Sequence, residues 1–272
     1  MRHAVRQVIR VATTGGAFAS FFLGGALLGW IVLPVVALTA RSSAEGARRC
    51  RRIVRASWVL FHDLLRVFRV IDYDPRKVRV ELPSGPCVVV ANHPTLLDAT
   101  AISAALPDLA IVAKTSMYRR PILGPLLRLC GFVEASDGSP FAGAQTVTRC
   151  LSLLGAGVSV LVFPEGTRSP ARGLGPFQAG AFQIAKRAGV PVLPLVVRCE
   201  PPTLLRGDAW YAVPPSTPRL TVEALAAPCS PEDDPVELAS RLREAYAQRV
   251  VAPPAPTKGT CKVSANPFPT AS

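Results

Sequence analysis

The stretch Cys87-Val-Val-Val-Ala-Asn-His-Pro-Thr-Leu-Leu-Asp98 decides the fold and contains the first candidate for chemistry. Its first five residues, 87–91, form a short apolar run with no charged side chain. Such a run is typical of a strand that is buried on both faces of a parallel sheet. The polar residues 92–98 then leave the strand at its carboxyl end and lead into a helix.

The same alternation of apolar runs and helical patterns continues on both sides of this stretch. Strands that alternate with helices indicate an α/β fold, in which a mostly parallel sheet is flanked by helices. Buried strands are expected at 109–113, 158–163 and 192–198, a later strand at 220–224, and helices at 96–106, 143–154 and 179–188.

Three weaker patterns complete this part of the chain. Residues 77–81 alternate between polar and apolar side chains and predict a strand, whereas 121–129 predict a short helix broken by a Gly-Pro pair. Ser230 has the side chain of a helix cap and is followed by proline, so a helix is expected from there to about Val250.

The N-terminal region contains an apolar segment, Gly15 to Ala40, without a single charged residue. About 20 apolar residues suffice to cross a bilayer, and a cleaved signal peptide would be shorter. We therefore expect a retained membrane helix, although Pro34 and several glycines leave a broken, re-entrant helix open. Arginines are densest after the segment, over 41–55, which places the main domain in the cytoplasm by the positive-inside rule.

Residues 56–71 have apolar side chains at helical spacing and predict an amphipathic helix. Such a helix lies at a membrane interface or packs against a core, and we expect the interface because basic residues lie beside it. The chain then divides into membrane-anchoring helices (1–72), a main domain (73–250) and a disordered tail (251–272) that is rich in Pro, Ala, Thr and Ser.

The net charge of +13 requires an explanation in terms of binding partners. Basic proteins bind nucleic acids, anionic membranes or acidic substrates. Here the arginines gather beside the apolar segment, which favours membrane lipids and argues against nucleic acid. The seven cysteines form no C-x-x-C pair, so reduced thiols are expected and a metal site is not.

His93 and Asp98 are the first candidates for catalysis. In open α/β sheets, functional side chains gather at the carboxyl ends of strands, and His93 leaves a buried strand at that end. Asp98 follows five residues later, close enough to fold back onto the imidazole and make it a better base. The alternative is a structural histidine and an aspartate that stabilises the first turn of a helix.

A second polar motif, Pro164-Glu-Gly-Thr-Arg-Ser169, follows the apolar run 158–163. Gly166 allows close approach of the backbone to a ligand, and the guanidinium of Arg168 suits a phosphate. The alternative is a surface turn with a solvated arginine.

Together these motifs resemble the glycerolipid acyltransferase family, and the bacterial 1-acylglycerol-3-phosphate acyltransferases in particular. That family has an N-H-x-x-x-x-D block, a G-x-x-x-x-x-R block, an F-P-E-G-T-R-S block and a late V-P-V-x-P block. This sequence contains Asn92–Asp98, Phe163–Ser169 and Val190–Pro194 in the same order, within a resemblance that spans about residues 85–198.

The resemblance implies a membrane-bound enzyme that transfers an acyl group from acyl-CoA or acyl carrier protein to a lipid hydroxyl. It needs neither a metal nor a further cofactor, and it is placed at the bacterial inner membrane with its catalytic domain facing the cytoplasm. His93 would be the general base and Asp98 would orient it. The implied substrate-binding residues are Asn92, Lys114, Glu165, Gly166, Thr167 and Arg168, with a solvated Lys114 as the alternative at that position.

The sequence departs from the family pattern at two places that lack positive charge. The second block, Gly131–Asp137, has no arginine, and the stretch Phe177–Gly180 has no lysine before its glycine. These changes keep other acceptors open, such as a lysophospholipid with another headgroup, an aminolipid, a glycolipid or a specialised metabolite. A non-catalytic lipid-binding protein with the same fold is the remaining alternative.

Overall fold

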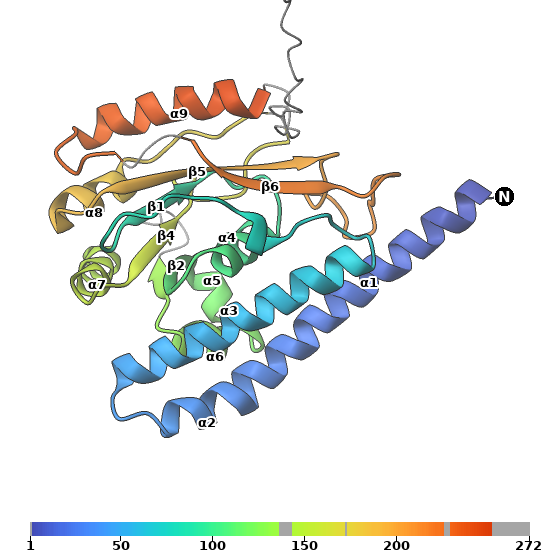
Figure 1. Ribbon diagram of the computed structural model, residues 1–272, viewed down its shortest axis with the longest axis horizontal. Coiled ribbons are helices and arrows are strands. Elements are labelled where there is room, and N and C mark those ends of the chain that lie inside the picture. The colour runs from blue at the N-terminus through green and yellow to red at the C-terminus, as the bar shows by residue number, and fades with distance from the viewer. Residues whose placement is uncertain (1, 136–142, 172, 226–228, 252–272) are drawn as a thin grey trace, which may run out of the picture.

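The computed structural model describes residues 2–135, 143–171, 173–225 and 229–251. Within these ranges the chain forms a six-stranded sheet in the order β3-β2-β4-β1-β5-β6 (Figure 1). All neighbouring strands pair in parallel except β6, which is antiparallel to β5. The predicted α/β fold with a mostly parallel sheet is confirmed. The strands are β1 (Val88–Ala91), β2 (Leu109–Lys114), β3 (Val133–Ala135), β4 (Ser159–Val162), β5 (Val192–Glu200) and β6 (Arg219–Ala224).

The centre of the sheet is built from the apolar runs seen in the sequence. All four residues of β1 are buried, and Val88 pairs with Val160 of β4 on one side and with Val192 of β5 on the other. β-Branched side chains suit a strand that is covered on both faces. Because β1 and β4 are parallel neighbours, the loops that follow Ala91 and Val162 leave the sheet side by side.

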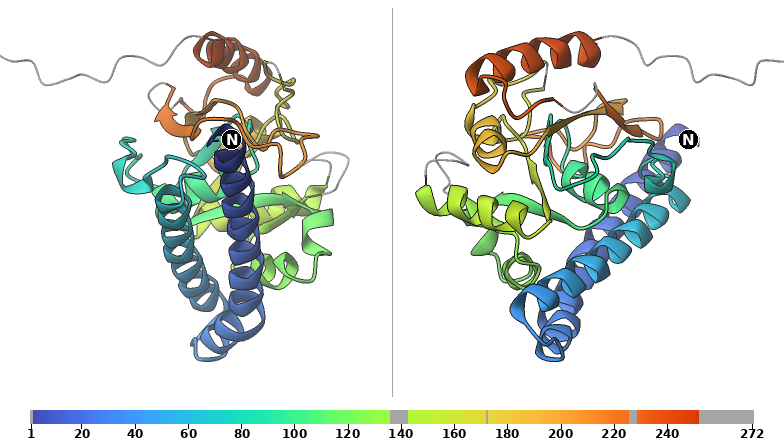
Figure 2. Two further views of the ribbon diagram at one scale, coloured as in Figure 1. Left: turned by 90° about the vertical axis from the view of Figure 1, so that its right-hand side faces the viewer. Right: turned by 60° about the vertical axis from the view of Figure 1, so that its left-hand side comes forward.

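Helices cover both faces of this sheet (Figures 1 and 2). On one face α7, α8 and α9 pack in sequence, and the hydroxyl of the fully buried Tyr246 in α9 donates to the carbonyl of Val90 at 3.0 Å. On the other face α3 packs against α4 and α6. The helices of the domain are α4 (Asp98–Ala105), α5 (Thr115–Tyr118), α6 (Leu123–Leu129), α7 (Ala144–Gly155), α8 (Gly180–Ala188) and α9 (Pro235–Val251).

The N-terminal region is a hairpin of two long helical segments (Figure 2). The first consists of α1 (Arg2–Leu27), a π-helical turn (Leu28–Val32) and α2 (Leu33–Leu38), and it runs through Pro34 without a break. Pro34 lies in the first turn of α2, where its missing N–H is tolerated. The segment is thus helical throughout, and a retained membrane helix, spanning or re-entrant, stays a prediction. Within the described residues, one helix, Val5–Leu38, is long and apolar enough to cross a membrane, and few of its residues are buried.

The returning helix, α3 (Ser43–Val67), is longer than the predicted amphipathic helix 56–71. Ser42 caps it by accepting a hydrogen bond from the amide of Glu45 at 3.2 Å. One face, which includes Cys50, Val54 and Leu65, is buried against the rest of the chain. The apolar face thus packs against the domain, and a location at a membrane interface stays a prediction.

Two expectations about local structure were wrong. The alternating segment 77–81 is not a strand, because Lys77 ends a short 3₁₀ helix (Pro75–Lys77) and the following Val78 and Val80 pack against the core without strand pairing. The predicted helix over 121–129 is not broken by its Gly-Pro pair. Pro125 falls in the first turn of α6, where its missing N–H costs no hydrogen bond.

Other boundaries differ from the predicted ones for local reasons. Helix α9 begins at Pro235 rather than after Ser230, because Asp234 accepts hydrogen bonds from the amides of Val236 and Glu237 at 2.9 and 3.0 Å. The short elements α5 and β3 were not predicted. The predicted disordered tail, 251–272, lies outside the described residues except for Val251.

Candidate active site

The loops after β1 and β4 form the candidate site, at the carboxyl edge of the sheet. They are joined directly, because the amide of Ser169 donates to the carbonyl of His93 at 2.8 Å. In return, the amide of His93 lies 3.2 Å from the hydroxyl of Ser169. The two sequence motifs, although about seventy residues apart, are therefore one structural unit.

His93 and Asp98 form the expected pair. The Nδ1 atom of His93 lies 2.8 Å from Oδ2 of Asp98, which is the first residue of α4. Asp98 is fully buried, and its carboxylate also accepts hydrogen bonds from the amide and hydroxyl of Thr95 at 2.7 and 3.1 Å. Burial raises the pKa of Asp98, while the hydrogen bonds from His93 and Thr95 act in the opposite direction.

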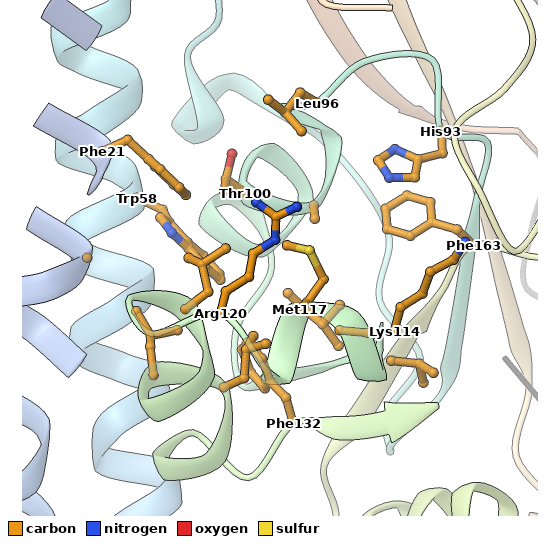
Figure 3. Close-up of a pocket in the computed structure, with 18 of the residues that line it drawn as sticks. Phe21, Trp58, His93, Leu96, Thr100, Lys114, Met117, Arg120, Phe132 and Phe163 are labelled. Atoms are coloured by element: carbon orange, nitrogen blue, oxygen red, sulfur yellow. The ribbon is translucent and has the colours of Figure 1, made fainter. Parts of the chain in front are cut away.

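This pairing fixes the orientation of the imidazole. Since the carboxylate accepts the Nδ1 proton, Nε2 is left as the basic nitrogen. The ring of His93 also stacks on Phe163, with 4.1 Å between centroids and 19° between planes (Figure 3). His93 is partly exposed and lines a cavity, so Nε2 is available to a ligand.

Glu165 holds the two loops together. One carboxylate oxygen accepts hydrogen bonds from the Ser169 hydroxyl at 2.6 Å and the His93 amide at 3.2 Å. The other accepts from the amide of Gly175 at 2.7 Å. Glu165 is buried and does not line the cavity. Its geometry supports the loop that carries His93 rather than contact with substrate.

Asn92 also faces inward. Its side-chain amide donates to the carbonyl of Val197 in β5 and accepts from the amide of the same residue, both at 2.8 Å. Asn92 is buried and absent from the cavity wall. It therefore ties the end of β1 to β5, and the structure gives no support to its expected substrate-binding role.

The four other expected binding residues do line the cavity: Lys114, Gly166, Thr167 and Arg168. Gly166 has a φ of +67°, a conformation that favours glycine. One guanidinium nitrogen of Arg168 donates to the carbonyls of Leu204 and Leu205 at 3.1 and 3.0 Å. These bonds fix Arg168 beside the loop and identify it as more than a solvated surface residue.

The cavity itself has a volume of about 540 Å³ and extends from His93 to the N-terminal hairpin. Its far wall is largely apolar and comes from helices remote in sequence, α1, α3 and α6. This wall was not predicted, although the sequence of the hairpin contains aromatic residues that line it. Contributing side chains include Phe18, Phe21, Trp58, Phe61, Leu126 and Phe132, of which Figure 3 labels Phe21, Trp58 and Phe132.

In the part of the chain that the structure describes, no three His, Cys, Asp or Glu side chains come together to hold a metal ion. The absence of a metal or cofactor stays a prediction. The arrangement offers instead a base, His93, whose nitrogen faces a cavity with cationic and apolar walls. Such a site can remove a proton from a hydroxyl group of an amphipathic ligand.

Comparisons with known proteins agree with this fold. Residues 69–198 match the sequence model of the acyltransferase family. A chloroplastic 1-acyl-sn-glycerol-3-phosphate acyltransferase of Brassica napus is 38% identical over 118 residues, which cover 43% of this chain and 34% of that protein. The enzyme of the same name from Pseudomonas aeruginosa is 31% identical over 178 residues, 65% of either protein.

The crystal structure of PlsC, the 1-acyl-sn-glycerophosphate acyltransferase of Thermotoga maritima, has the same fold. Its TM-score is 0.65 at 19% identity, over 91% of this chain and 95% of that one. The sequence match and the fold together indicate an α/β domain of the acyltransferase type over residues 69–198. These matches confirm the resemblance of residues 69–198 to the family that contains the 1-acyl-sn-glycerol-3-phosphate acyltransferases. The chain spans between about a third and two thirds of the curated relatives quoted above.

Proposed function

We propose that this protein transfers a fatty acyl group from an acyl thioester to a hydroxyl of a lysophospholipid of the 1-acylglycerol-3-phosphate type. The observation that carries the proposal is the His93–Asp98 pair at 2.8 Å, with its free nitrogen facing a cavity that is cationic near the loops and apolar beyond them. That division of the walls matches an acceptor with a polar headgroup and a fatty chain.

In the proposed reaction His93 is the general base. Its Nε2 takes the proton of the acceptor hydroxyl while the hydroxyl oxygen attacks the thioester carbonyl carbon. The C–S bond then breaks, and the sulfur leaves as a thiol with the proton returned from His93. Asp98 holds the ring and stabilises the imidazolium that forms between these steps. No covalent intermediate with the protein is needed.

The acyl donor would be acyl-CoA or acyl carrier protein, and the apolar far wall of the cavity would take an acyl chain. The long helix Val5–Leu38 supports attachment to membrane lipids, in which both the acceptor and the product dissolve. The arginines beside it support a cytoplasmic orientation at the bacterial inner membrane.

An assay on membranes that contain the full chain tests this proposal. Radiolabelled acyl-CoA and acyl carrier protein would be offered with a panel of acceptors: 1-acylglycerol-3-phosphate, other lysophospholipids, a lyso-aminolipid and a monoacylglycerol. We expect transfer to 1-acylglycerol-3-phosphate that is lost in His93→Ala. Transfer that is equal in wild type and His93→Ala would refute the base, and transfer to no acceptor would favour a non-catalytic lipid-binding protein.

A further inference from the structure

Thr95 is a third side chain that contacts the pair formed by His93 and Asp98. It lies between these two residues in the chain, at a position that the N-H-x-x-x-x-D block leaves open. Thr95 is fully buried and does not line the cavity. A substrate in the cavity therefore does not reach it, and any effect of Thr95 on the reaction is exerted through the pair.

The hydrogen bonds of Thr95 show where its hydroxyl proton points. Its Oγ1 accepts a hydrogen bond from the amide of Leu97 at 2.8 Å and lies 3.1 Å from Oδ1 of Asp98. Because an ionised carboxylate can only accept, the hydroxyl donates to Oδ1. The backbone amide of Thr95 donates to the other oxygen, Oδ2, at 2.7 Å. A single residue thus donates to both oxygens of the catalytic carboxylate.

The two oxygens of Asp98 differ in how many donors they have. Oδ2 is shared by the amide of Thr95 and Nδ1 of His93, whereas within the described residues the hydroxyl of Thr95 is the one donor to Oδ1. Burial raises the pKa of Asp98, and the hydrogen bonds from His93 and Thr95 oppose that rise. Removing the hydroxyl would leave Oδ1 buried without a donor and would make the carboxylate easier to protonate.

The other groups around Asp98 cannot replace this hydroxyl. Among the described residues the carboxylate forms an ion pair with His93 and with no arginine or lysine. Cys199 of β5 lies near it, but burial, with a smaller contribution from the charge of Asp98, raises the pKa of that thiol to about 12, so it stays neutral. Helix α3, which packs on α4, directs His62 to the hydroxyl of Thr100 instead.

We propose that Thr95 is a positioning residue of the reaction, whose hydroxyl keeps Asp98 ionised and thereby keeps the proton of His93 on Nδ1. This inference rests on the proposed function. A protonated Asp98 would neither favour the Nδ1 proton nor stabilise the imidazolium that forms when His93 takes the proton of the acceptor. The active form, a neutral His93 beside an ionised Asp98, would then be lost at a higher pH than in wild type.

The test compares Thr95→Val, which removes the hydroxyl and keeps the amide, with Thr95→Ser, which keeps both. We expect Thr95→Val to lower kcat by about 10-fold at unchanged KM values and to move the acid limb of kcat/KM upward by about one pH unit, the equivalent of one hydrogen bond to a charged group. Thr95→Ser should retain the wild-type pH profile. Thr95→Cys, which has a weaker donor, should move the profile in the same direction by less and serves if the valine variant does not fold.

Thr146 provides the matched control. It is also a buried threonine, and its hydroxyl donates to the carbonyl of Glu134 at 3.0 Å, but it does not line the cavity. Thr146→Val should unfold at a lower temperature, as Thr95→Val should, and should leave kcat and the pH profile unchanged. An acid limb that Thr95→Val and Thr95→Cys leave in place would overturn the inference, since a purely structural role lowers stability without moving this limb. Equal losses in Thr95→Ser and Thr95→Val would overturn it as well.

Nitrogen NMR of the His93 ring in the full-length protein in detergent separates this inference from the proposed function, because it needs no substrate. The chain has only three histidines, so substitution of His3 and His62 assigns the signals. A titration of His93 that moves to higher pH in Thr95→Val, without acyl transfer by wild type, would refute the proposed reaction and keep the role of Thr95. A titration that does not move, in a wild type that transfers acyl groups, would refute the role of Thr95 and keep the reaction.

Discussion

The loops after β1 and β4 and the N-terminal hairpin line the same cavity, but they are held in different ways. The loops are fixed by buried polar contacts, since Asp98 and Glu165 each accept hydrogen bonds from at least two groups. The hairpin contributes apolar side chains such as Trp58 and Phe21, and many of its large apolar residues stay exposed. A fixed geometry at His93 and an adaptable apolar wall suit the proposed acyl transfer, in which the substrates would vary mainly in their fatty chains.

The largest expected effect comes from breaking the contact that orients His93. Asp98→Asn keeps the size of the side chain but removes the charge that favours the Nδ1 proton. We expect kcat to fall by about 10²- to 10⁴-fold, the range that a positioned base contributes. Steady-state kinetics on membranes would measure it.

Asp63 in the hairpin provides the control for that variant. It pairs with Arg66 and Arg76 in a partly exposed network, and Asp63→Asn should leave kcat within about twofold, since such pairs contribute little. If kcat falls equally in Asp98→Asn and Asp63→Asn, the loss does not depend on the contact with His93, and the proposed orienting role of Asp98 is wrong.

The next effect concerns the way the loops are joined. Both carboxylate oxygens of Glu165 accept hydrogen bonds, so in Glu165→Gln the new NH₂ group must face a donor. That donor is the amide of Gly175 in one orientation of the side chain, and the Ser169 hydroxyl with the His93 amide in the other. A buried donor that loses its acceptor costs about 1–3 kcal/mol. We expect a lower unfolding temperature and a lower kcat with an unchanged donor KM.

Thermal unfolding in detergent and kinetics would be measured together for this variant. The hairpin offers Glu45, whose pairing with Arg49 is exposed, as a matched site. Glu45→Gln should alter neither measurement. If Glu165→Gln instead raises only the acceptor KM, Glu165 contacts substrate, as the sequence motif suggested, and its role as a structural link is wrong.

The residues that could be predicted from the sequence are those whose partners lie close to them in the chain. His93 and Asp98 are five residues apart, and the strand before them is apolar enough to place both at the edge of a sheet. The motif could not show which of its members face inward, because Asn92 and Glu165 find their partners on other strands and loops. Phe21 and Trp58 were missed for the same reason. They reach the cavity only through the packing of helices that are distant in sequence, and no local pattern records that packing.

A smaller effect should come from His62, a buried imidazole in α3. Its Nε2 lies 3.2 Å from the hydroxyl of Thr100, and burial lowers its pKa to about 4 from an ordinary value of 6.5. The unfolded chain binds the His62 proton more readily than the folded chain does. The contribution of the neutral, buried His62 to the free energy of unfolding is therefore fully present above pH 6.5 and is lost as the pH falls toward 4. The loss amounts to about 1.4 kcal/mol per pH unit in that interval.

Unfolding temperatures measured between pH 7 and pH 4.5 would test this dependence. His62→Gln should be less stable than wild type at pH 7 but should lose less stability on acidification. If the unfolding temperature falls equally with pH in both proteins, another group, and not the contact between His62 in α3 and Thr100 in α4, causes the loss of stability in acid.

The smallest expected effect concerns the apolar wall itself. Trp58 on α3 lines the cavity and lies 6.4 Å, centroid to centroid, from Phe132. Trp58→Ala would enlarge the cavity at the end that is distant from His93. We therefore expect this variant to prefer longer acyl chains by a few fold, because one buried methylene contributes about 0.8 kcal/mol. Competition among acyl donors of different length would measure this preference.

Leu60 provides the control: it lies on the same helix but is 70% exposed and absent from the wall, and Leu60→Ala should leave the preference unchanged. A large fall in kcat for all chain lengths in Trp58→Ala would mean that the hairpin positions the reacting atoms as well as the chain.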